Sequence, residues 1–365
     1  MTDSAPARGL KVSLLHHPIY PLSYSLEVFR TAEELGFHAC YCADAYRFKD
    51  PWTLLAAAAG ATRRIRLGPN ATHVFLRDPT LVAQSLATLD ELSGGRVEAV
   101  VSFGGPALLR RYYVQWQGTR PIERVKEALL VMRSFLDTGQ CDHRGQFFRY
   151  AALATLARPL QDHLPLMMAS TGGRLAMRAA GEVADGAHVL LARSRRAFEY
   201  AWEQVLAGAR KAGRDPGTLD LAAVLVVVCS EDGEAARELA RLFVATYLPI
   251  LPDTLAELNG IPRERLLPVR EAFAQGDVPR MVSLATRDLT DSIAFAGTPD
   301  DLLRDLRENV LPSGARHLVL MVVGPRYAQS TFGLAVERVP EIDGQLRLIA
   351  ERVLAPLGLA GTQAL

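Results

Sequence analysis

The stretch LDELSGGRVEAVVSFGG, residues 89–105, carries the clearest change of structure in the chain. A helical pattern ends at Ser93, Gly94 and Gly95, and an apolar run follows at once and breaks on Gly104 and Gly105. A glycine just past a helix is the usual left-handed C-cap. A glycine just past a strand indicates that the backbone comes close to something else. We therefore interpret the first glycine pair as structural and the second as part of a site.

The same helix-to-strand unit repeats along the first third of the sequence. Strands are predicted to end near residues 15, 42, 70 and 102, so successive ends are 27, 28 and 32 residues apart. That spacing is the length of one strand plus one crossover helix. The predicted strands lack polar–apolar alternation, which is typical of a sheet covered on both faces. Units of this kind form either a doubly wound sheet or a barrel.

The number of predicted strands favours the closed barrel. They cover residues 11–15, 38–42, 64–70, 96–102, 165–170, 186–191, 219–230 and 315–324. One crossover helix is strongly marked, with Asp78 as its N-cap, Pro79 at its first position and Gly94 past its end. We expect an α/β fold, a (β/α)8 TIM barrel in one domain over residues 1–365, with insertions after strands 4 and 7. The second insertion, at about 231–297, is predicted to be mostly helical.

Composition indicates a protein that acts on small molecules. Apolar residues make up 49% of the 365 positions, and 41 Lys and Arg nearly balance 40 Asp and Glu, so no nucleic-acid or membrane partner is expected. No apolar run reaches membrane-spanning length and the N-terminus has no apolar signal core, so we expect a cytoplasmic location. The pair Cys40 and Cys42 has no neighbouring ligands that would indicate a metal site.

Active sites of barrels lie at the carboxyl ends of the strands. The predicted strand ends carry polar groups and glycines at His16, His17, Asp44, Asn70, His73, Ser102, Gly104, Gly105, Ser170, Thr171 and His188. They contain no Ser-His-Asp signature, no H-E-x-x-H and no glycine-rich loop ending in Lys-Ser or Lys-Thr. A G-x-G-x-x-G pattern after the first strand is also absent, which argues against a Rossmann dinucleotide enzyme.

The strongest local signal is MASTGGRLAMRAAG, which starts at residue 168. A strand ends at Ser170 and Thr171, and Gly172 and Gly173 open a helix next to Arg174. Free backbone N–H groups, two hydroxyl groups and a guanidinium at the positive end of a helix predict a phosphate-binding site. The alternative is a plain N-cap whose glycines ease the turn.

The runs LGPNATHVFLRDPTLVAQSLATLDELSGGRVEAVVSFGG and ASTGGRLAMRAAGEVADG resemble the bacterial luciferase-like superfamily. The resemblance covers nearly the whole chain and is strongest to the coenzyme F420-dependent oxidoreductase branch, the methylenetetrahydromethanopterin reductase-like proteins. Members are (β/α)8 barrels that bind FMN or the deazaflavin coenzyme F420. The resemblance implies a homodimer and a non-proline cis peptide bond between Asn70 and Ala71, in a bulge behind the cofactor ring.

The resemblance also implies that cofactor-binding residues lie at the ends of strands two to five. They are Asp44, Asn70, Ala71, Thr72, Ser102, Phe103, Gly104, Gly105, Ser170, Thr171, Gly172, Gly173 and Arg174. Coenzyme F420 is the expected cofactor, because these patterns are closer to the deazaflavin reductases and dehydrogenases than to true luciferases. FMN is the alternative.

Two positions depart from the family pattern. Many deazaflavin members show Asp-His at the end of strand two, where this chain has Asp44 and Ala45, and the run GGPALLRRYY lacks the glutamate of the sugar-phosphate dehydrogenase. Both differences argue against sugar-phosphate oxidation and leave the proton donor open. His73 is the first candidate and His17 the second, because histidine titrates near neutral pH. For both histidines the alternative role is a hydrogen bond to a loop. Asp44 is the third candidate, and its alternative role is a helix N-cap.

We therefore expect an F420-dependent oxidoreductase that transfers a hydride from the reduced coenzyme to an activated C=C or C=N bond of a small molecule, such as a natural-product precursor. Tyr112, Tyr113, Trp116 and the insertion at 231–297 are expected to shape a mostly apolar substrate pocket. The alternatives are an FMN-dependent monooxygenase, a non-enzymatic flavin-binding protein and a cofactor-free barrel acting on a phosphorylated metabolite.

Overall fold

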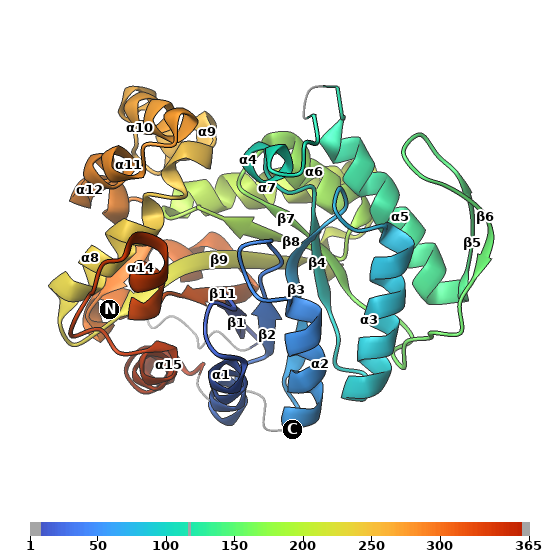
Figure 1. Ribbon diagram of the computed structural model, residues 1–365, viewed down its shortest axis with the longest axis horizontal. Helices are drawn as coiled ribbons and strands as arrows, with labels where there is room; N and C mark the ends of the chain where they lie inside the picture. Colours follow the sequence, from blue (N-terminus) through green and yellow to red (C-terminus); the bar gives the residue numbers. More distant parts are fainter. Residues whose placement is uncertain (1–8, 116–117, 360–365) are drawn as a thin grey trace.

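A closed barrel of parallel strands forms the centre of the computed structural model, which describes residues 9–115 and 118–359 (Figure 1). Eight strands of the described residues build the barrel: β1 (Lys11–His16), β2 (Ala39–Cys42), β3 (Arg66–His73), β4 (Ala99–Ser102), β7 (Leu166–Ser170), β8 (Gly186–Leu190), β9 (Asp220–Cys229) and β11 (His317–Val322). They pair in the order β9-β11-β1-β2-β3-β4-β7-β8, and pairing of β8 with β9 closes the ring. The predicted (β/α)8 barrel is therefore confirmed.

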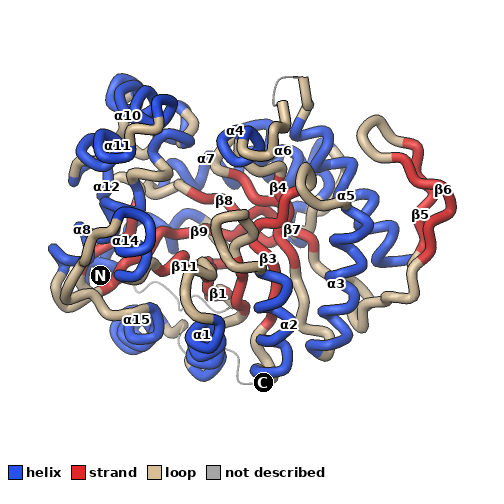
Figure 2. Tube along the Cα trace, viewed as in Figure 1, coloured by secondary structure: helices blue, strands red, loops and turns tan. Residues whose placement is uncertain are grey.

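Helices surround the barrel, as the blue segments around the red strands in Figure 2 show. The crossover helices are α1 (Leu22–Glu34), α2 (Pro51–Ala61), α3 (Pro79–Ser93), α5 (Pro121–Thr138), α6 (Arg174–Val183), α7 (Arg195–Lys211) and α13 (Pro299–Asp305), and α14 (Pro325–Phe332) and α15 (Ile342–Ile349) follow the last strand. Both faces of each strand are thus covered, which explains the continuous apolar runs in the sequence.

The predicted limits of α3 are confirmed. The Asp78 carboxylate accepts a hydrogen bond from the backbone N–H of Thr80 at 2.9 Å, and Gly94 ends the helix with a φ of 75°. The next strand, β4, begins at Ala99 and not at the predicted residue 96. Val97 nevertheless forms an isolated parallel bridge with Leu67, whose backbone N–H donates to the carbonyl group of Arg96 at 2.9 Å, so the chain already runs beside β3 before β4 begins.

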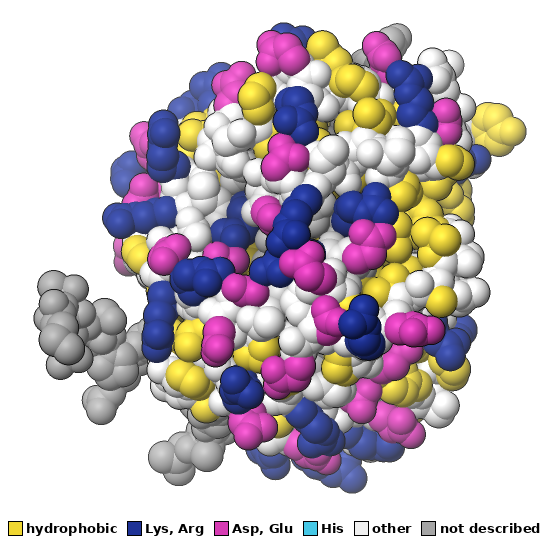
Figure 3. Space-filling model, turned by 90° about the vertical axis from the view of Figure 1, so that its left-hand side faces the viewer, with side chains coloured by type: hydrophobic (Ala, Val, Ile, Leu, Met, Phe, Trp, Pro, Cys, Tyr) yellow, Lys and Arg dark blue, Asp and Glu magenta, His cyan; other side chains and the backbone are white. Residues whose placement is uncertain are grey.

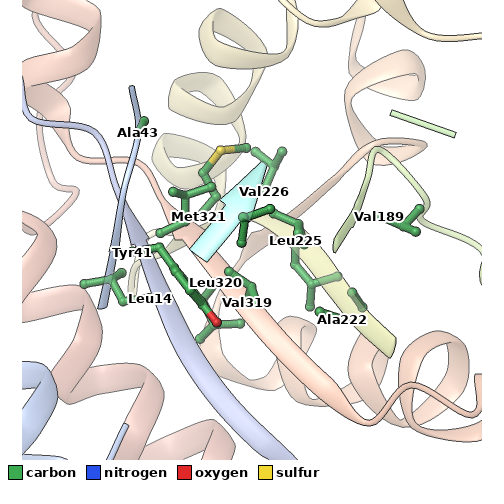
Figure 4. Close-up of a cluster of buried hydrophobic side chains, with 14 of the residues drawn as sticks. Leu14, Tyr41, Ala43, Val189, Ala222, Leu225, Val226, Val319, Leu320 and Met321 are labelled. Atoms are coloured by element: carbon green, nitrogen blue, oxygen red, sulfur yellow. The ribbon is translucent and has the colours of Figure 1, made fainter. Parts of the chain in front are cut away.

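Apolar side chains from β1, β2, β8, β9 and β11 belong to the buried cluster shown in Figure 4. Tyr41 reaches from this cluster to Glu98, to which its hydroxyl donates a hydrogen bond. Arg66 Nε donates to the same carboxylate at 2.8 Å. Burial opposes ionisation of Glu98, but the hydrogen bond and charge of His38 and the charge of Arg66 outweigh it and hold the pKa of Glu98 below its usual range.

The first insertion, after β4, contains helices and a two-stranded hairpin. After β4 come α4 (Pro106–Arg110), α5 and an antiparallel hairpin of β5 (Gln140–Arg144) and β6 (Arg149–Ala154), which lies beyond α3 and α5 in Figure 1. The Glu127 carboxylate fixes the hairpin turn, because it accepts hydrogen bonds from the backbone N–H groups of Phe147 at 3.1 Å and Phe148 at 2.8 Å.

The second insertion contains α8 (Gly233–Val244), α9 (Asp253–Leu258), α10 (Arg263–Gln275), α11 (Val278–Leu284) and α12 (Arg287–Asp291). It ends in a short strand, β10 (Ala294–Gly297), which pairs with the second half of β9. Figure 3 shows the side of the molecule on which this insertion lies, where charges of both signs are interspersed. Ion pairs such as Arg287 with Glu234, at 2.8 Å, belong to this surface.

No helix in the described part of the chain is long and apolar enough to cross a membrane. The four cysteines are buried and free. Among the residues with described positions, no group of three or more His, Cys, Asp or Glu side chains is placed to hold a metal ion.

Candidate active site

A cavity opens at the carboxyl ends of the barrel strands, with a volume of about 1120 Å³ that includes its part open to solvent. It is lined by Leu15, His17, Ala43, Asp44, Ala45, Phe48, Asn70, Ala71, His73, Ser102, Phe103, Gly104, Gly105, Ala169, Ser170, Thr171, His188, Leu190, Val224, Tyr247, Ile250 and Met321. The cavity therefore brings together most of the residues that the sequence singled out. Thr72, Gly172, Gly173 and Arg174 lie outside its lining.

The floor of the cavity is formed by a bulge in β3. The peptide bond between Asn70 and Ala71 is cis, as the resemblance implied, and the pairing of β3 with β4 shifts register between Asn70 and Thr72. The side-chain amide of Asn70 lies 3.0 Å from His188 Nδ1. Burial, and then the nearby His317, lower the pKa of His188 to about 3, so its imidazole is neutral and Nδ1 accepts a hydrogen bond from Asn70 Nδ2.

Next to this floor, His73 and the end of β4 form one wall. His73 Nδ1 is hydrogen-bonded to Ser102 Oγ at 2.8 Å, and burial lowers the pKa of His73, although the Asp44 charge opposes this effect. Gly104 has a φ of +73°, which favours glycine, and a Cβ there would lie 3.5 Å from the His73 ring. A Cβ at Gly105 would meet nothing within 4 Å, so this residue borders open space.

Asp44 is held in an ion pair at the end of β2. Its carboxylate accepts hydrogen bonds from Arg77 Nε at 2.9 Å and from Thr72 Oγ1 at 3.0 Å. The alternative role of Asp44 as a helix N-cap is wrong, because Asp50 caps α2 by accepting from the backbone N–H of Thr53 at 2.8 Å. Arg77, which sequence reasoning missed, thus neutralises the carboxylate at the cavity.

The turn from β7 to α6 contains the two glycines that the sequence singled out, Gly172 and Gly173. Ser170 Oγ accepts a hydrogen bond from the backbone N–H of Gly172 at 3.1 Å. Gly172 has a φ of +100°, and a Cβ there would lie 2.4 Å from the Leu255 side chain of α9. The N-cap of α6 is Gly173, without a side-chain cap, so the first backbone N–H groups of the helix keep their capacity to bind an anion. Arg174 is exposed beside them.

The opposite side of the cavity is mostly aromatic and apolar. The ring of His17 lies 5.1 Å from Phe48 and 5.7 Å from Phe243. Burial, and then the charge of Arg47, lower the pKa of His17 to about 4, so this imidazole is also neutral. The neighbouring His16 does not line the cavity, because its ring packs against α1, where Nε2 is hydrogen-bonded to Ser25 Oγ at 2.9 Å.

The aromatic residues expected in the pocket are not the ones found there. Tyr112 and Tyr113 are 45% and 96% exposed and do not line the cavity, and Trp116 lies outside the described residues. The second insertion does contribute, through Tyr247 and Ile250. Sequence reasoning did not single out either residue.

Comparison with known proteins shows the family of this chain. Residues 8–317 match a family model described as luciferase-like monooxygenase. The chain belongs to this family.

Two curated relatives are reductases. One is a 5,10-methylenetetrahydromethanopterin reductase of Methanolobus tindarius, 30% identical over 291 residues, or 80% of this chain and 87% of the relative. Another, from Archaeoglobus fulgidus and of the same name, is 27% identical over 325 residues, or 87% of this chain and 96% of the relative. Both matches extend over most of the barrel.

A solved structure has the same fold. It is a coenzyme F420-dependent tetrahydromethanopterin reductase from Methanopyrus kandleri, with a TM-score of 0.82 and 24% sequence identity. The match covers 95% of this chain and 99% of that one. At this level of identity the likeness establishes the fold.

Proposed function

We propose that this oxidoreductase uses reduced coenzyme F420 to transfer a hydride to an activated C=C or C=N bond of a small molecule, such as a natural-product precursor. The observation that carries the proposal is the bulge of β3 between Asn70 and Thr72, beside a β4 that is followed by Gly104 and Gly105 at the cavity. Together these segments form a floor at Asn70 and Ala71 and a wall that includes Gly104 and Gly105. Relatives whose names state a reductase activity support the same chemistry.

The residues present fit a flat ring with a phosphate-bearing tail. Open space beside Gly105 leaves room for a ring, and the cavity is as large as a typical cofactor site. The α6 N-terminus has N–H groups without a side-chain cap, next to the hydroxyl groups of Ser170 and Thr171, and this arrangement suits a phosphate. When bound, the reduced deazaflavin supplies the hydride.

The chain's own groups would orient the ligands and manage the proton. The Asn70 amide, held by His188, faces the ring site, and the Asp44 carboxylate is held in place by Arg77. His73 Nδ1 is engaged by Ser102, so proton exchange with a ligand would take place at Nε2. Apolar side chains such as Leu15, Val224 and Met321 line the opposite side of the cavity.

FMN is the alternative cofactor, since the family model is described by monooxygenases. The test is a fluorescence titration of the purified protein with coenzyme F420 and, separately, with FMN. We expect micromolar or tighter binding of F420 and weak binding of FMN. Preference for FMN, with oxygen consumption in the presence of a flavin reductase, would overturn the proposal.

A pair of variants locates the site. Thr171→Val removes a hydroxyl group from the predicted phosphate site and should weaken F420 binding. Thr246→Val makes the same change at a hydroxyl that bonds the carbonyl group of Phe243, outside the cavity lining, and should leave binding unchanged. Equal effects of the two changes would place the coenzyme elsewhere.

We also propose that the chain forms a homodimer. Exposed leucines gather on the side of the molecule formed by α3, α5 and the segment after β6: Leu81, Leu92, Leu130, Leu156 and Leu160. Leu156 is fully exposed, and groups of exposed apolar residues mark interaction surfaces. Sedimentation velocity should show a dimer that Leu92→Asp together with Leu156→Asp converts to a monomer. A wild-type monomer at micromolar concentration would contradict this.

A further inference from the structure

The cavity has two walls of different chemistry. In the closed strand order, β1 lies opposite β7 and β11 lies opposite β4, because four strand steps separate the members of each pair. The groups proposed to bind the coenzyme lie on β3, β4 and β7 and at the end of β2. The facing wall consists of Leu15, His17, Val224, Met321, Tyr247 and Ile250. The second wall is therefore the one that a substrate would contact.

Tyr247 supplies a hydroxyl group to this second wall. It lies between α8 and the short 3-10 turn η2 (Leu248–Ile250), and its ring stacks on Phe243 with centroids 4.9 Å apart. Within the described part of the chain, the one hydrogen bond of its hydroxyl group goes to the sulfur of Met321, at 4.0 Å. A thioether is a weak acceptor, so the donor capacity of this phenol is nearly unused.

The position of Tyr247 differs from that of its neighbour Tyr327 on α14. Tyr327 also packs on Phe243, with centroids 4.8 Å apart, but it does not line the cavity, and its hydroxyl lies 3.5 Å from Thr246 Oγ1. Burial, and then Tyr327, raise the pKa of Tyr247, which keeps the phenol protonated at neutral pH. Tyr247 is thus a fixed donor that borders the cavity.

The charges around the cavity restrict what the second wall accepts. No lysine or arginine is among the described residues that line it, and its carboxylate, Asp44, is already paired with Arg77. With pKa values of about 4 for His17 and about 3 for His188, these imidazoles carry no charge at neutral pH. Arg47 lies over the Phe48 ring, 5.6 Å from its centroid, and its charge acts on both His17 and Tyr247. Because burying an isolated charge is costly and this positive charge repels a cation, the wall disfavours a cationic iminium group.

We propose that Tyr247 donates a hydrogen bond to the carbonyl oxygen of an uncharged, mostly apolar substrate whose reducible C=C bond is conjugated to that carbonyl. This inference rests on the proposed function and selects the activated C=C bond over the C=N bond of a cationic iminium group. An iminium nitrogen carries a positive charge and has no lone pair for a phenol donor, whereas a carbonyl oxygen is neutral and accepts a hydrogen bond.

The reaction balances with the reduced coenzyme as the reductant. Hydride addition to the β-carbon breaks the C=C π bond, and the electron pair moves through the α-carbon to the carbonyl oxygen. The hydrogen bond from Tyr247 stabilises the charge that develops on this oxygen. A proton then adds to the α-carbon and restores the carbonyl, so that one hydride and one proton give the saturated product.

The test compares Tyr247→Phe with Tyr327→Phe. Each substitution removes a phenol hydroxyl group from a ring that packs on Phe243, but Tyr327 does not line the cavity. With 2-cyclohexen-1-one as the probe and reduced F420 in excess, we expect kcat to fall roughly 100- to 1,000-fold in Y247F and to stay within about twofold in Y327F. Both variants should bind F420 as the wild type does. Equal rates in Y247F and the wild type, or equal losses in the two variants, would overturn the inference.

A second measurement does not depend on turnover. Cyclohexanone bound to the protein with oxidised F420 should show its carbonyl stretch at lower frequency in the wild type and in Y327F than in Y247F. Absence of that difference overturns the role of Tyr247. If F420 binds but the wild type reduces no enone, the substrate class is wrong and the proposed function stands. If F420 does not bind, the proposed function itself fails.

Discussion

Replacing Gly172 with alanine should destabilise the protein, because two penalties combine at this position. An L-residue in the left-handed region costs about 1–2 kcal/mol, and Gly172 has a φ of +100°. The new Cβ would lie 2.4 Å from Leu255 Cδ2, and Leu255 is fully buried, so its side chain would have to leave its rotamer. Such a displacement costs about 0.5–1.5 kcal/mol. Less the roughly 0.5 kcal/mol gained from a stiffer unfolded chain, the expected loss is about 1–3 kcal/mol.

Urea unfolding followed by tryptophan fluorescence measures this loss, and two variants separate its parts. Gly173→Ala is the control for the same turn, because Gly173 has a φ of −69° and a Cβ there would meet nothing within 4 Å. It should cost about 1 kcal/mol or less. In the double variant with Leu255→Ala the clash is gone. The loss of unfolding free energy in this double variant should therefore be roughly 0.5–1.5 kcal/mol smaller than the sum of the losses in the two single variants. Strict additivity, or equal losses for G172A and G173A, would refute the reasoning.

Two further predictions concern buried polar groups. Because the pKa of Glu98 is depressed in the folded state, its contribution to stability is present above the unfolded value of about 4.3 and is lost as the pH falls below it. Urea unfolding between neutral pH and about pH 3.5 should therefore show a smaller acid-induced loss in Glu98→Gln than in the wild type, and parallel curves would contradict the assignment. His188→Phe leaves the buried Asn70 Nδ2 without its acceptor, which should cost about 1–3 kcal/mol in the same assay and weaken F420 binding. Unchanged stability and affinity would show that this hydrogen bond does not hold Asn70.

The sequence predicted the parts of the fold that depend on local repetition. Strand-plus-helix spacing located the barrel strands, and the caps of α3 lie where Asp78 and Gly94 indicated. The hairpin was missed because β6 reads RYAALA, mostly exposed and without alternation, and its turn depends on Glu127 in a distant part of α5. The strand β10 was missed because four apolar residues carry no usable period.

The residues of the candidate site also fall into those that the sequence could indicate and those that it could not. Strand ends are visible in the sequence, so Asn70, His73 and Ser170 could be singled out before the structure was known. Arg77 could not be paired with Asp44, because the contact spans 33 residues and forms only when the ends of β2 and β3 meet. Tyr247 lies in an insertion whose helices face both solvent and barrel. The four-residue spacing from Phe243 was the one available sign that it lies on the inner face.

The long strand β9 gives the second insertion a particular place in the molecule. Its first half pairs with β8 and its second half with β10, so the chain leaves the sheet after β9 and returns beside the same strand. The intervening helices form an excursion that starts and ends at one point of the barrel. Such a segment can change in length or sequence without altering the hydrogen bonds between barrel strands. A change in this insertion would therefore alter the wall that carries Tyr247 and leave the floor at Asn70 as it is. Substrate preference could change in this way while the proposed coenzyme site stays the same.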